Sequence, residues 1–511
     1  MLTFSPFAAF RTVFRTEGAL AILQHFDTLY SILHHFRTVD SIVKEDALEL
    51  MMKAVTSHSS DLTAILNNAD LVASLRVLHL NALKMNCYIL VRLVEAFEME
   101  SGKNNLVGLD SKRKSKKNQA KGFIWEEERQ SVLQLLTQLL QLDLHQLWSG
   151  LIVEEEFVSL VTGCCYRILE NPSIGHQRNQ PTRDAAIHLL GVALRRYDHM
   201  LSATLKVVQM LQHFEHVAPV FVEAVGVWIK EYGMKSIVGE LLREIGQKCP
   251  QELARDASGM KGYATFLSEL AEQTPSIVLA NMSVLLHHLD GESYGMRNAI
   301  LTAMAEVLLK VLNGEQLEEA ARTTRDHFLD TLQAHMCDVN GFVRSRVLQL
   351  FTRIVQQKAL PLTRFQAVVC LTVGRLQDKS VTVVKNAIQL LAAFLSNNPF
   401  SCKLSRRDLQ TPLMVQTADA KLLIPPTVPG ETCPIGPRKG HRTQLPWLLP
   451  PIETEKVSAS SESRTLAVED YRDRNFHSDF SAQDLIYDYT GLSYMPLDPD
   501  DIQDLQFDHQ Y

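Results

Sequence analysis

The sequence lacks long apolar runs and paired cysteine motifs. Among its 511 residues no stretch of 18 or more is apolar throughout, which argues against a membrane span. The opening segment MLTFSPFAAFRTVFR carries Arg11 and Arg15 after its apolar residues, the reverse of the order in a signal peptide. The eight cysteines form no CxxC motif and, apart from the adjacent Cys164 and Cys165, stand alone. Such cysteines are typical of reduced thiols packed in the core of a cytoplasmic or nuclear protein.

The motifs of common enzyme classes are missing as well. The sequence contains no GxxxxGKS/T phosphate loop, no GxGxxG after a strand, no HExxH and no GxSxG. The acidic stretch WEEER at 125–129 is expected to start a helix, because carboxylates stabilise the positive end of the helix dipole. We therefore expect a protein that is not an enzyme, with no catalytic residue, no cofactor and no small-molecule substrate.

Histidine pairs are the nearest approach to a metal site. His213 and His216 stand three residues apart in a segment expected to be helical, a spacing that suits two ligands of one metal ion. No cysteine, aspartate or further histidine completes the set, so we expect surface or packing histidines and no metal. The same interpretation applies to two adjacent pairs, His34–His35 and His287–His288.

What the sequence has in abundance is apolar residues at helical spacing. Hydrophobic residues make up 46% of the chain, and from about residue 8 to 400 they recur every three or four positions. LAILQHFDTLYSILHHF from Leu20 and ERQSVLQLLTQLLQLDLHQLW from Glu128 are examples. This spacing places apolar side chains on one face of an amphipathic helix, and no alternating strand pattern competes with it. The predicted fold class is all-α.

Composition divides the chain into a helical N-terminal segment, a basic disordered loop, a set of HEAT-type helical repeats and a tail. These parts span residues 1–100, 101–122, 123–404 and 405–511, respectively. The tail begins rich in proline, with nine of the chain's 19 prolines between Thr411 and Pro451. It ends acidic, with 12 Asp/Glu against 3 Arg from Ser461 onward. Such a composition buries too little apolar surface to offset its ordering entropy, so we expect a disordered tail.

A run of basic residues in the loop is the sharpest local signal. Lys112, Arg113, Lys114, Lys116 and Lys117 follow one another closely, although the whole chain has a net charge of −7. Three interpretations stay open: a solvated loop without a partner, a nuclear-import signal, or a patch that contacts DNA phosphates. No aromatic residue is interleaved, which disfavours stacking on single-stranded nucleic acid.

One pattern recurs along the repeats and is clearest in residues 290–395. In CDVNGFVRSRVLQLFTRIV, a turn acid, Asp338, precedes a base, Arg344, and an apolar helix follows. The other two pairs of this kind are Asp290 with Arg297 and Asp378 with Lys385. The three bases are 47 and 41 residues apart. This period is typical of HEAT-type pairs of antiparallel helices, which bury their apolar faces only by stacking on one another.

These acids and bases have a structural interpretation. A turn acid can cap the second helix of its repeat and lies within reach of a base from its own or a neighbouring repeat. We therefore expect structural joints between repeats and not an acid–base active site. Two apolar stripes follow Asp338, one with Val343 and Val347 and the other with Leu348 and Phe351. Two stripes predict burial on both flanks, as in an inner repeat.

Several stretches carry a more specific resemblance. They include LQHFDTLYSILHHFRTVD, HLNALKMNCY, EEEFVSLVTGCCYRILENP and RTTRDHFLDTLQAHMCDVNGFVRSRVLQLFTRIVQQKALPLTRFQAVV. In such stretches, across about residues 10–404, the chain resembles the condensin complex subunit 1 family, the HEAT-repeat, non-SMC subunits of condensin I. The resemblance implies a HEAT-repeat α-solenoid, an armadillo-like helical superhelix. After FLSNNPFSCKLS the sequence departs from the family, whose members continue into an acidic helical region and further repeats.

The same resemblance implies a function. It indicates a regulatory scaffold subunit that binds the kleisin subunit and the pair of SMC ATPases of condensin. Such a subunit helps to convert interphase chromatin into condensed mitotic chromosomes during cell division, with non-specific DNA and histones as further candidate partners. The expected location is the nucleus, the cytoplasm and mitotic chromosomes.

Two alternatives stay open. The chain could be a generic HEAT-repeat adaptor, a transport or phosphatase scaffold, which would share the period but not these specific stretches. It could also be an inactive truncated isoform, because the open end of a solenoid exposes apolar surface unless a cap covers it.

Overall fold

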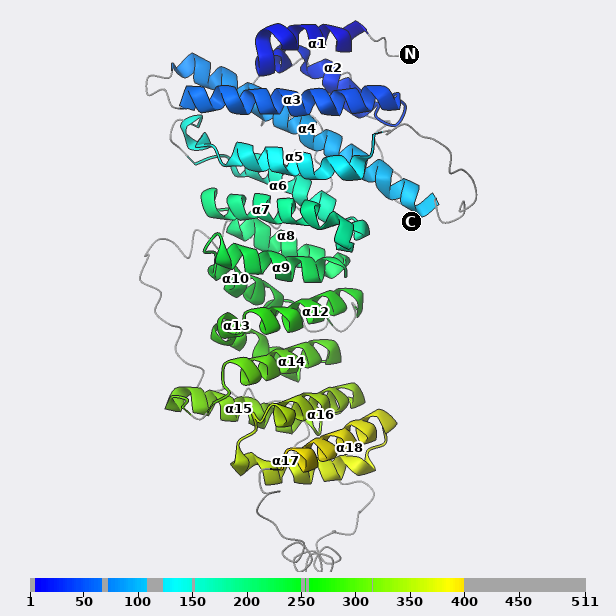
Figure 1. Cartoon of the computed structure of the whole chain (residues 1–511), viewed down its shortest axis with the longest axis vertical. Coiled ribbons are helices and arrows are strands. Elements are labelled where there is room, and N and C mark those ends of the chain that lie inside the picture. Colours follow the sequence, from blue (N-terminus) through cyan, green and yellow to red (C-terminus); the bar gives the residue numbers. More distant parts are fainter. Residues whose placement is uncertain are drawn as a thin grey trace, which may run out of the picture. The chain divides into compact units, whose positions relative to one another are not determined.

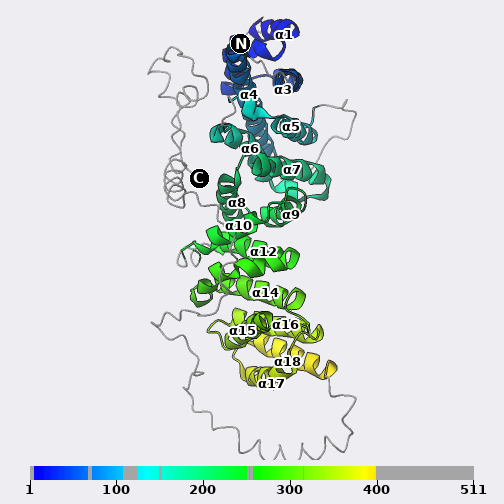
Figure 2. The same cartoon turned by 90° about the vertical axis from the view of Figure 1, so that its left-hand side faces the viewer.

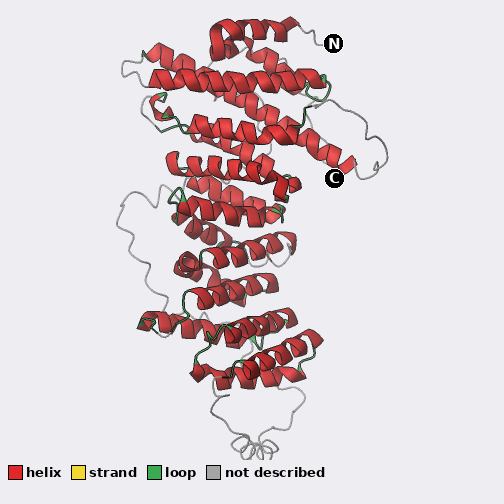
Figure 3. Cartoon of the chain, in the orientation of Figure 1, coloured by secondary structure: helices red, strands yellow, loops and turns green. Residues whose placement is uncertain are grey.

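In the described part of the chain the regular elements are helices, joined by turns and loops, which confirms the predicted all-α class (Figure 3). The computed structural model describes residues 5–66, 72–107, 123–148, 152–249, 253, 257–314 and 316–398. These residues fall into two compact units. The first holds residues up to Asn171 together with Asp184–Ala193, and the second holds Pro172–Arg183 and the residues from Leu194 onward.

The first unit is built around one long helix. Its helices are α1 (Ser5–Glu17), α2 (Ile22–His34), α3 (Ser41–Leu66), α4 (Ala73–Val107), α5 (Trp125–Leu140) and α6 (Glu155–Leu169), and α7 (Gln180–Arg196) lies mostly in this unit. α2, α3 and α6 all pack against α4. α4 therefore buries apolar residues on several sides, among them Leu83, Leu90 and Val94.

α4 differs from the sequence expectation in two respects. It extends to Val107, so the loop predicted from residue 101 begins later, and residues 108–122 lie outside the described part of the chain. Its segment Ala73–Ser101 is long and apolar enough to cross a membrane, although Lys84 and Arg92 interrupt the apolar run. Of its most apolar window 67% is buried against neighbouring helices, as in the core helix of a globular unit.

The second unit is a stack of helical pairs. Its helices are α8 (Met200–His213), α9 (Val217–Lys230), α10 (Ser236–Gly246), α12 (Ala257–Gln273), α13 (Pro275–Asn281), η5 (Met282–Asp290), α14 (Tyr294–Lys310), α15 (Glu319–His335), α16 (Gly341–Gln356), α17 (Leu362–Gly374) and α18 (Val381–Ser396). The second helices of successive pairs, from α9 through α12, α14 and α16 to α18, pack against one another in one layer (Figures 1 and 2). The first helices form a second layer, as Figure 2 shows for α8, α10, α15 and α17.

Burial on both flanks holds the inner helices of this stack. α16 packs against α14 on one side and α18 on the other. Both of its apolar stripes are buried, the one with Val343 and Val347 and the one with Leu348 and Phe351, which confirms the inner-repeat prediction. The close approach of α12 to α8 depends on a glycine. A Cβ at Gly262 would lie 2.0 Å from the carbonyl oxygen of Leu211.

Candidate functional site: an ion-pair ladder between repeats

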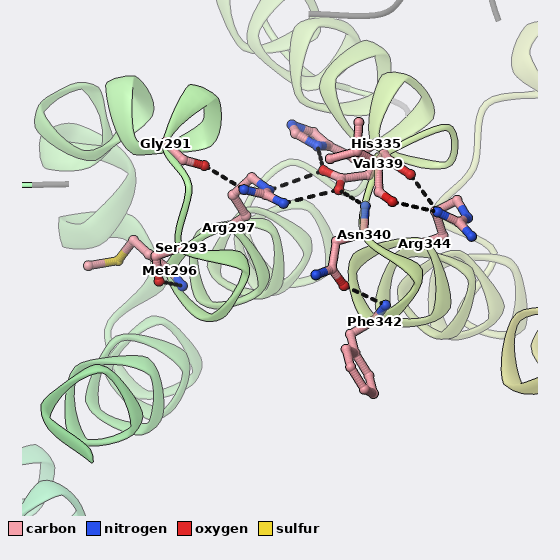
Figure 4. Close-up of polar contacts among 10 residues, drawn as sticks. Gly291, Ser293, Met296, Arg297, His335, Val339, Asn340, Phe342 and Arg344 are labelled. Carbon is pink, nitrogen blue, oxygen red and sulfur yellow. Dashed lines mark hydrogen bonds and ion pairs between the residues drawn. The ribbon is translucent and has the colours of Figure 1, made fainter. Parts of the chain in front are cut away.

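Arg297 joins one repeat to the turn of the next. It lies in the first turn of α14, where the Ser293 side chain accepts a hydrogen bond from the Met296 N–H and so begins the helix. Arg297 Nε and Nη2 donate to the two carboxylate oxygens of Asp338, each at 3.1 Å, and Nη1 donates to the carbonyl oxygen of Gly291 (Figure 4). Both charged side chains are buried. A bidentate guanidinium–carboxylate pair is strong and geometrically specific.

Arg344 repeats this arrangement one step along the stack. Its Nε and Nη2 donate to Asp378 at 2.7 and 2.8 Å. Its Nη1 donates to the carbonyl oxygen of Asp338 at 2.7 Å, as Arg297 does to that of Gly291 (Figure 4). Each arginine therefore holds its own turn through a carbonyl oxygen and the following turn through a carboxylate. We call these two joints, Arg297–Asp338 and Arg344–Asp378, the ladder.

Each aspartate also organises the turn in which it lies. Asp338 accepts a hydrogen bond from the Asn340 N–H at 2.7 Å, and Asp378 accepts one from the Ser380 N–H at 3.0 Å. The Asn340 side chain then caps α16 by accepting from the Phe342 N–H at 2.8 Å (Figure 4). Aspartate and asparagine therefore occur in these turns because their side chains accept the free N–H groups of the turn and of the helix that follows.

The ladder is charged at neutral pH. Burial by itself would raise the pKa of Asp338, but hydrogen bonds from His335 and the Asn340 N–H, together with the charge of Arg297, outweigh it and lower the pKa. Burial opposes ionisation of Asp378 in the same way, and Arg344 and the Ser380 N–H lower its pKa below the ordinary value. The hydrogen bond to Asp378 in turn raises the pKa of Arg344.

Two of the six predicted joint residues lie outside the ladder. Counted from the residue that begins each second helix, Arg297 and Arg344 are both four residues past Ser293 and Asn340. Lys385 is five residues past Ser380, so Val384 occupies the equivalent position in α18. Lys385 is exposed and forms no ion pair among the described residues. The sequence pattern matched an acid with a later base in each repeat, but it did not specify how far that base lies from the start of the helix.

Asp290 is displaced by one residue in the opposite direction, toward the N-terminus. The residue equivalent to Asp338, two before the start of the helix, is Gly291. Asp290 itself is exposed and has no ion-pair partner within the part of the chain that the structure describes. The ladder therefore begins at Arg297 and ends at Asp378, with Asp338 in the middle.

Exposed apolar side chains border the ladder. Tyr294 stacks on Phe342 with ring centroids 5.6 Å apart, and the two residues are 48% and 68% exposed. Val339, in the same turn as Asp338, is 77% exposed. We call these three residues the aromatic edge. Large exposed apolar residues that touch one another across two successive repeats are typical of an interaction surface.

A further buried ion pair lies in the first unit, and no sequence pattern predicted it. Glu98 of α4 accepts hydrogen bonds from Trp125 Nε1 at 2.7 Å, from Nε and Nη2 of Arg129, the latter at 2.8 Å, and from Asn171 Nδ2 at 3.2 Å. Arg129 and Glu98 are both buried. The acidic start of α5 at Glu126, Glu127 and Glu128 was predicted correctly. The residues of α5 that contact Glu98 are instead Trp125 and Arg129. The only sequence signal was an acid, Glu98, within an apolar helix.

The remaining candidates have ordinary surroundings. Cys164 and Cys165 are buried in α6, where burial raises the pKa of both thiols, so the core assignment is confirmed. His213 ends α8 and His216 precedes α9, so the expectation that one helix carries both is wrong. Groups of three or more metal-binding side chains are absent from the described residues. The basic run Lys112–Lys117 lies outside them.

The other histidine pairs are contacts between neighbours. The rings of His34 and His35 meet edge to face at the end of α2, with centroids 4.8 Å apart. His288 is buried in η5, where its Nε2 lies 3.0 Å from the carbonyl oxygen of Gly246. Both pairs therefore agree with surface or packing roles.

Stacked helical pairs linked by buried ion pairs define an α-helical repeat protein of the HEAT type. A family of such proteins matches the sequence. Residues 41–203 match the family described as non-SMC mitotic condensation complex subunit 1, N-terminal part. Condensin complex subunit 1 of Homo sapiens is 68% identical over 412 residues, which is 80% of this chain and 29% of that protein.

More distant relatives extend the match. Condensin complex subunit 1 of Xenopus laevis is 55% identical over 90% of this chain and 35% of its own length. Condensin-1 complex subunit CAP-D2 of Arabidopsis thaliana is 26% identical over 74% of this chain and 27% of its own. The chain belongs to the condensin complex subunit 1 family, and it spans about a third of the length of the curated relatives it matches.

Proposed function

We propose that this chain is a regulatory, non-catalytic scaffold subunit of condensin. In this role it binds the kleisin subunit and the SMC ATPase pair and helps to convert interphase chromatin into condensed mitotic chromosomes. The corresponding location is the nucleus and mitotic chromosomes, with a cytoplasmic pool. Family membership supports the assignment to condensin.

The observation that carries the scaffold role is the ladder. Arg297, Asp338, Arg344 and Asp378 all use their charges to hold repeats together, which leaves them unsuited to acid–base chemistry. The aromatic edge beside them is exposed. Rigid repeats with an exposed apolar edge suit the binding of an extended peptide, for which we propose a segment of the kleisin.

Co-purification from a mitotic extract tests this proposal. The tagged chain is compared with Phe342→Ser, and Ile152→Ser is the matched control because Ile152 is an exposed apolar residue of the first unit. We expect mass spectrometry to find the kleisin and both SMC ATPases with the wild type and the control, and to find less of them with Phe342→Ser. Recovery of transport cargo or a phosphatase catalytic subunit would identify a generic adaptor, and recovery of chaperones alone would identify an inactive truncated isoform.

DNA is a second proposed partner, and the basic run Lys112–Lys117 is its proposed contact. Five cations in close succession can release counterions from DNA without reading its sequence. We expect replacement of all five by alanine to weaken DNA binding and to flatten its salt dependence by about 0.9 log units per lost phosphate contact. Unchanged affinity and salt slope would remove this segment from the interface. Histones are tested in the same titration as a competing ligand.

A further inference from the structure

Polar contacts between α14 and α16 continue the line of the aromatic edge. The two helices pack side by side in the second unit (Figures 1 and 2). Beyond the stacked rings, Arg346 Nε donates to Thr302 Oγ1 at 3.1 Å. Further toward the ends of both helices, Arg353 Nη1 donates to Glu306 Oε1 at 2.5 Å. Both arginines therefore reach from α16 across to α14.

The residues of α16 that border this line share one face of the helix. Phe342, Arg346, Gln349 and Arg353 are spaced by four, three and four residues, which places them on a single face. Phe342 and Gln349 are exposed, and the two arginines are half-buried. We call these four residues the α16 strip. The aromatic edge and the arginines thus belong to one continuous surface.

Arg346 has no acidic partner on this surface. Its hydrogen bonds go to the hydroxyl of Thr302 and, at 3.5 Å, to the side-chain oxygen of Gln349, and both groups are neutral. Burial and the nearby charge of Arg353 lower the pKa of Arg346, and the charge of Glu306 opposes them. Arginine nevertheless stays charged at neutral pH. A half-buried charge with neutral partners gains more from an incoming anion than a fully solvated arginine does.

The neighbouring charges balance one another. Arg353 pairs with Glu306, and Lys310 Nζ lies 4.0 Å from Glu306 Oε2 and 3.7 Å from Glu272 Oε1 of α12. These two bases and two acids alternate in sign, which leaves Arg346 as the charge without a counterpart. The surface therefore suits one anionic group. A polyanion such as DNA would bring further phosphates toward the exposed carboxylate of Glu272.

The spacing along α16 determines where that anionic group must lie in a bound peptide. Phe342 and Arg346 are four residues apart, or about 6 Å along the helix axis. In an extended peptide, side chains two residues apart point to the same side and are separated by roughly 6.6 Å. A peptide that lies along α16 with an apolar side chain on Phe342 therefore places the side chain two residues away at Arg346.

We propose that the α16 strip selects an extended peptide with an apolar residue and, two residues away, a single acidic group that pairs with Arg346. A guanidinium group binds a carboxylate or a phosphoryl group through paired hydrogen bonds, so aspartate, glutamate or a phosphorylated serine can supply the anion. The single unbalanced charge favours the carboxylate. This inference rests on the peptide-binding role proposed above, and it adds the acidic residue by which the peptide is recognised.

A peptide array tests the inference with the full chain. The peptides carry one fixed phenylalanine, and every amino acid and phosphoserine is placed in turn at each flanking position. A parallel set has serine in place of the phenylalanine. Arg346→Gln removes the charge and keeps a polar side chain, whereas Arg346→Lys keeps the charge. Arg322→Gln is the matched control, because Arg322 is an exposed arginine of α15 in the same unit. Thermal melting confirms that each variant is folded.

We expect the wild type and the control to prefer aspartate and glutamate over their amides about tenfold, two residues from the phenylalanine. Arg346→Gln should lose this preference and still prefer phenylalanine over serine, and Arg346→Lys should keep part of both preferences. Stronger selection of phosphoserine than of glutamate would support the site and identify a phosphorylated partner. An acid preference that Arg346→Gln leaves unchanged would overturn the inference.

Two further outcomes separate this inference from the proposed function. Selection of phenylalanine by the wild type without any preference for an acid would overturn the inference and leave the peptide-binding role standing. Equal retention of all peptides by the wild type and by Phe342→Ser would count against the peptide-binding role itself, and the inference would fall with it. Displacement of the acidic peptide by duplex DNA would assign Arg346 to nucleic acid and would also overturn the inference.

Discussion

The side chain of Arg344 is hydrogen-bonded to the main-chain carbonyl oxygen of Asp338, and this bond connects the two joints of the ladder. Arg344 donates to the carbonyl oxygen of Asp338 at 2.7 Å, while the carboxylate of Asp338 holds Arg297 of the preceding repeat. The turn that contains Asp338 is therefore hydrogen-bonded to two arginines, Arg297 from the preceding repeat and Arg344 from the helix that follows it. Groups that share a network of this kind are expected to show coupled energies, so the two joints should not respond independently to mutation.

Replacement of Arg344 by alanine should destabilise the second unit. The change leaves the buried Asp378 carboxylate with Arg375 as its nearest cation, at 3.6 Å. We expect a loss of about 2–3 kcal/mol in unfolding free energy, less than for a fully buried pair because solvent reaches part of Arg344. Denaturant unfolding measures the loss. Lys385→Ala is the control, since Lys385 is exposed and one residue out of register, and it should change stability by less than about 0.5 kcal/mol. Equal effects of the two changes would contradict the assigned register.

A charge within the buried stripe of α16 should cost more than loss of the joint. Val347 is fully buried between α14 and α18, so Val347→Asp removes apolar packing and buries a carboxylate without a partner. We expect a lower melting temperature than for Arg344→Ala, measured by circular dichroism. Gln349→Asp places the same carboxylate two residues further on, at an exposed position, and should leave melting nearly unchanged. An unaffected melting temperature in Val347→Asp would mean that α16 is not an inner helix.

Local patterns in the sequence predicted the helices and four of the six residues assigned to the joints. The two stripes of α16 follow from spacing and residue type. The same pattern predicted that Arg344 reaches a turn acid of its own or a neighbouring repeat, and the structure shows that the acid is Asp378 of the next turn. The displacement of Asp290 and Lys385 does not follow from it, because a shift of one residue moves a side chain by 100° around the helix while the composition stays the same. Register became visible only from Ser293, Asn340 and Ser380, which begin the helices.

Local patterns in the sequence could not predict contacts between residues that are far apart in the chain. Glu98 and Arg129 are 31 residues apart and lie on different helices, and periodicity specifies only which face each helix buries. A buried acid finds its partner through the packing of the helices, which one sequence does not encode in any short pattern. The residues 108–122 that follow α4 also illustrate this limit, because polar composition marked a boundary several residues before the helix ends at Val107.

Acid should weaken the first unit through His58. Burial, together with the nearby His79, lowers the pKa of His58 to about 3, and its Nε2 lies 3.3 Å from His79 Nδ1. An unfolded histidine has a pKa near 6.5, so the unfolded chain binds a proton that the folded unit rejects. The contribution of this site is therefore present above pH 6.5 and is lost as the pH falls from 6.5 toward 3.

Hydrogen exchange in α3 between pH 7 and pH 5 measures this loss, after correction for the intrinsic pH dependence of exchange. Each pH unit well below 6.5 should reduce stability by about 1.4 kcal/mol in the wild type, so the loss between pH 7 and pH 5 should total about 2 kcal/mol. His58→Leu removes the titrating group and should flatten the slope, while His35→Leu, at an exposed position, should keep it. A slope unchanged by His58→Leu would show that another group controls the acid response.

A methyl group at Gly262 should separate α12 from α8. Because its Cβ would lie 2.0 Å from the Leu211 carbonyl oxygen, a backbone atom, the two helices must move apart to accept Gly262→Ala. We expect a loss of about 1–3 kcal/mol, typical of overpacking, despite the higher helix propensity of alanine. Gly163→Ala in α6 is the matched control, since its Cβ would have no neighbour within 4 Å, and it should be neutral or stabilising by up to about 1 kcal/mol. If both changes stabilised the chain in denaturant unfolding, α12 and α8 would not be in backbone contact, and the stacking of the first two pairs of the second unit would need a different arrangement.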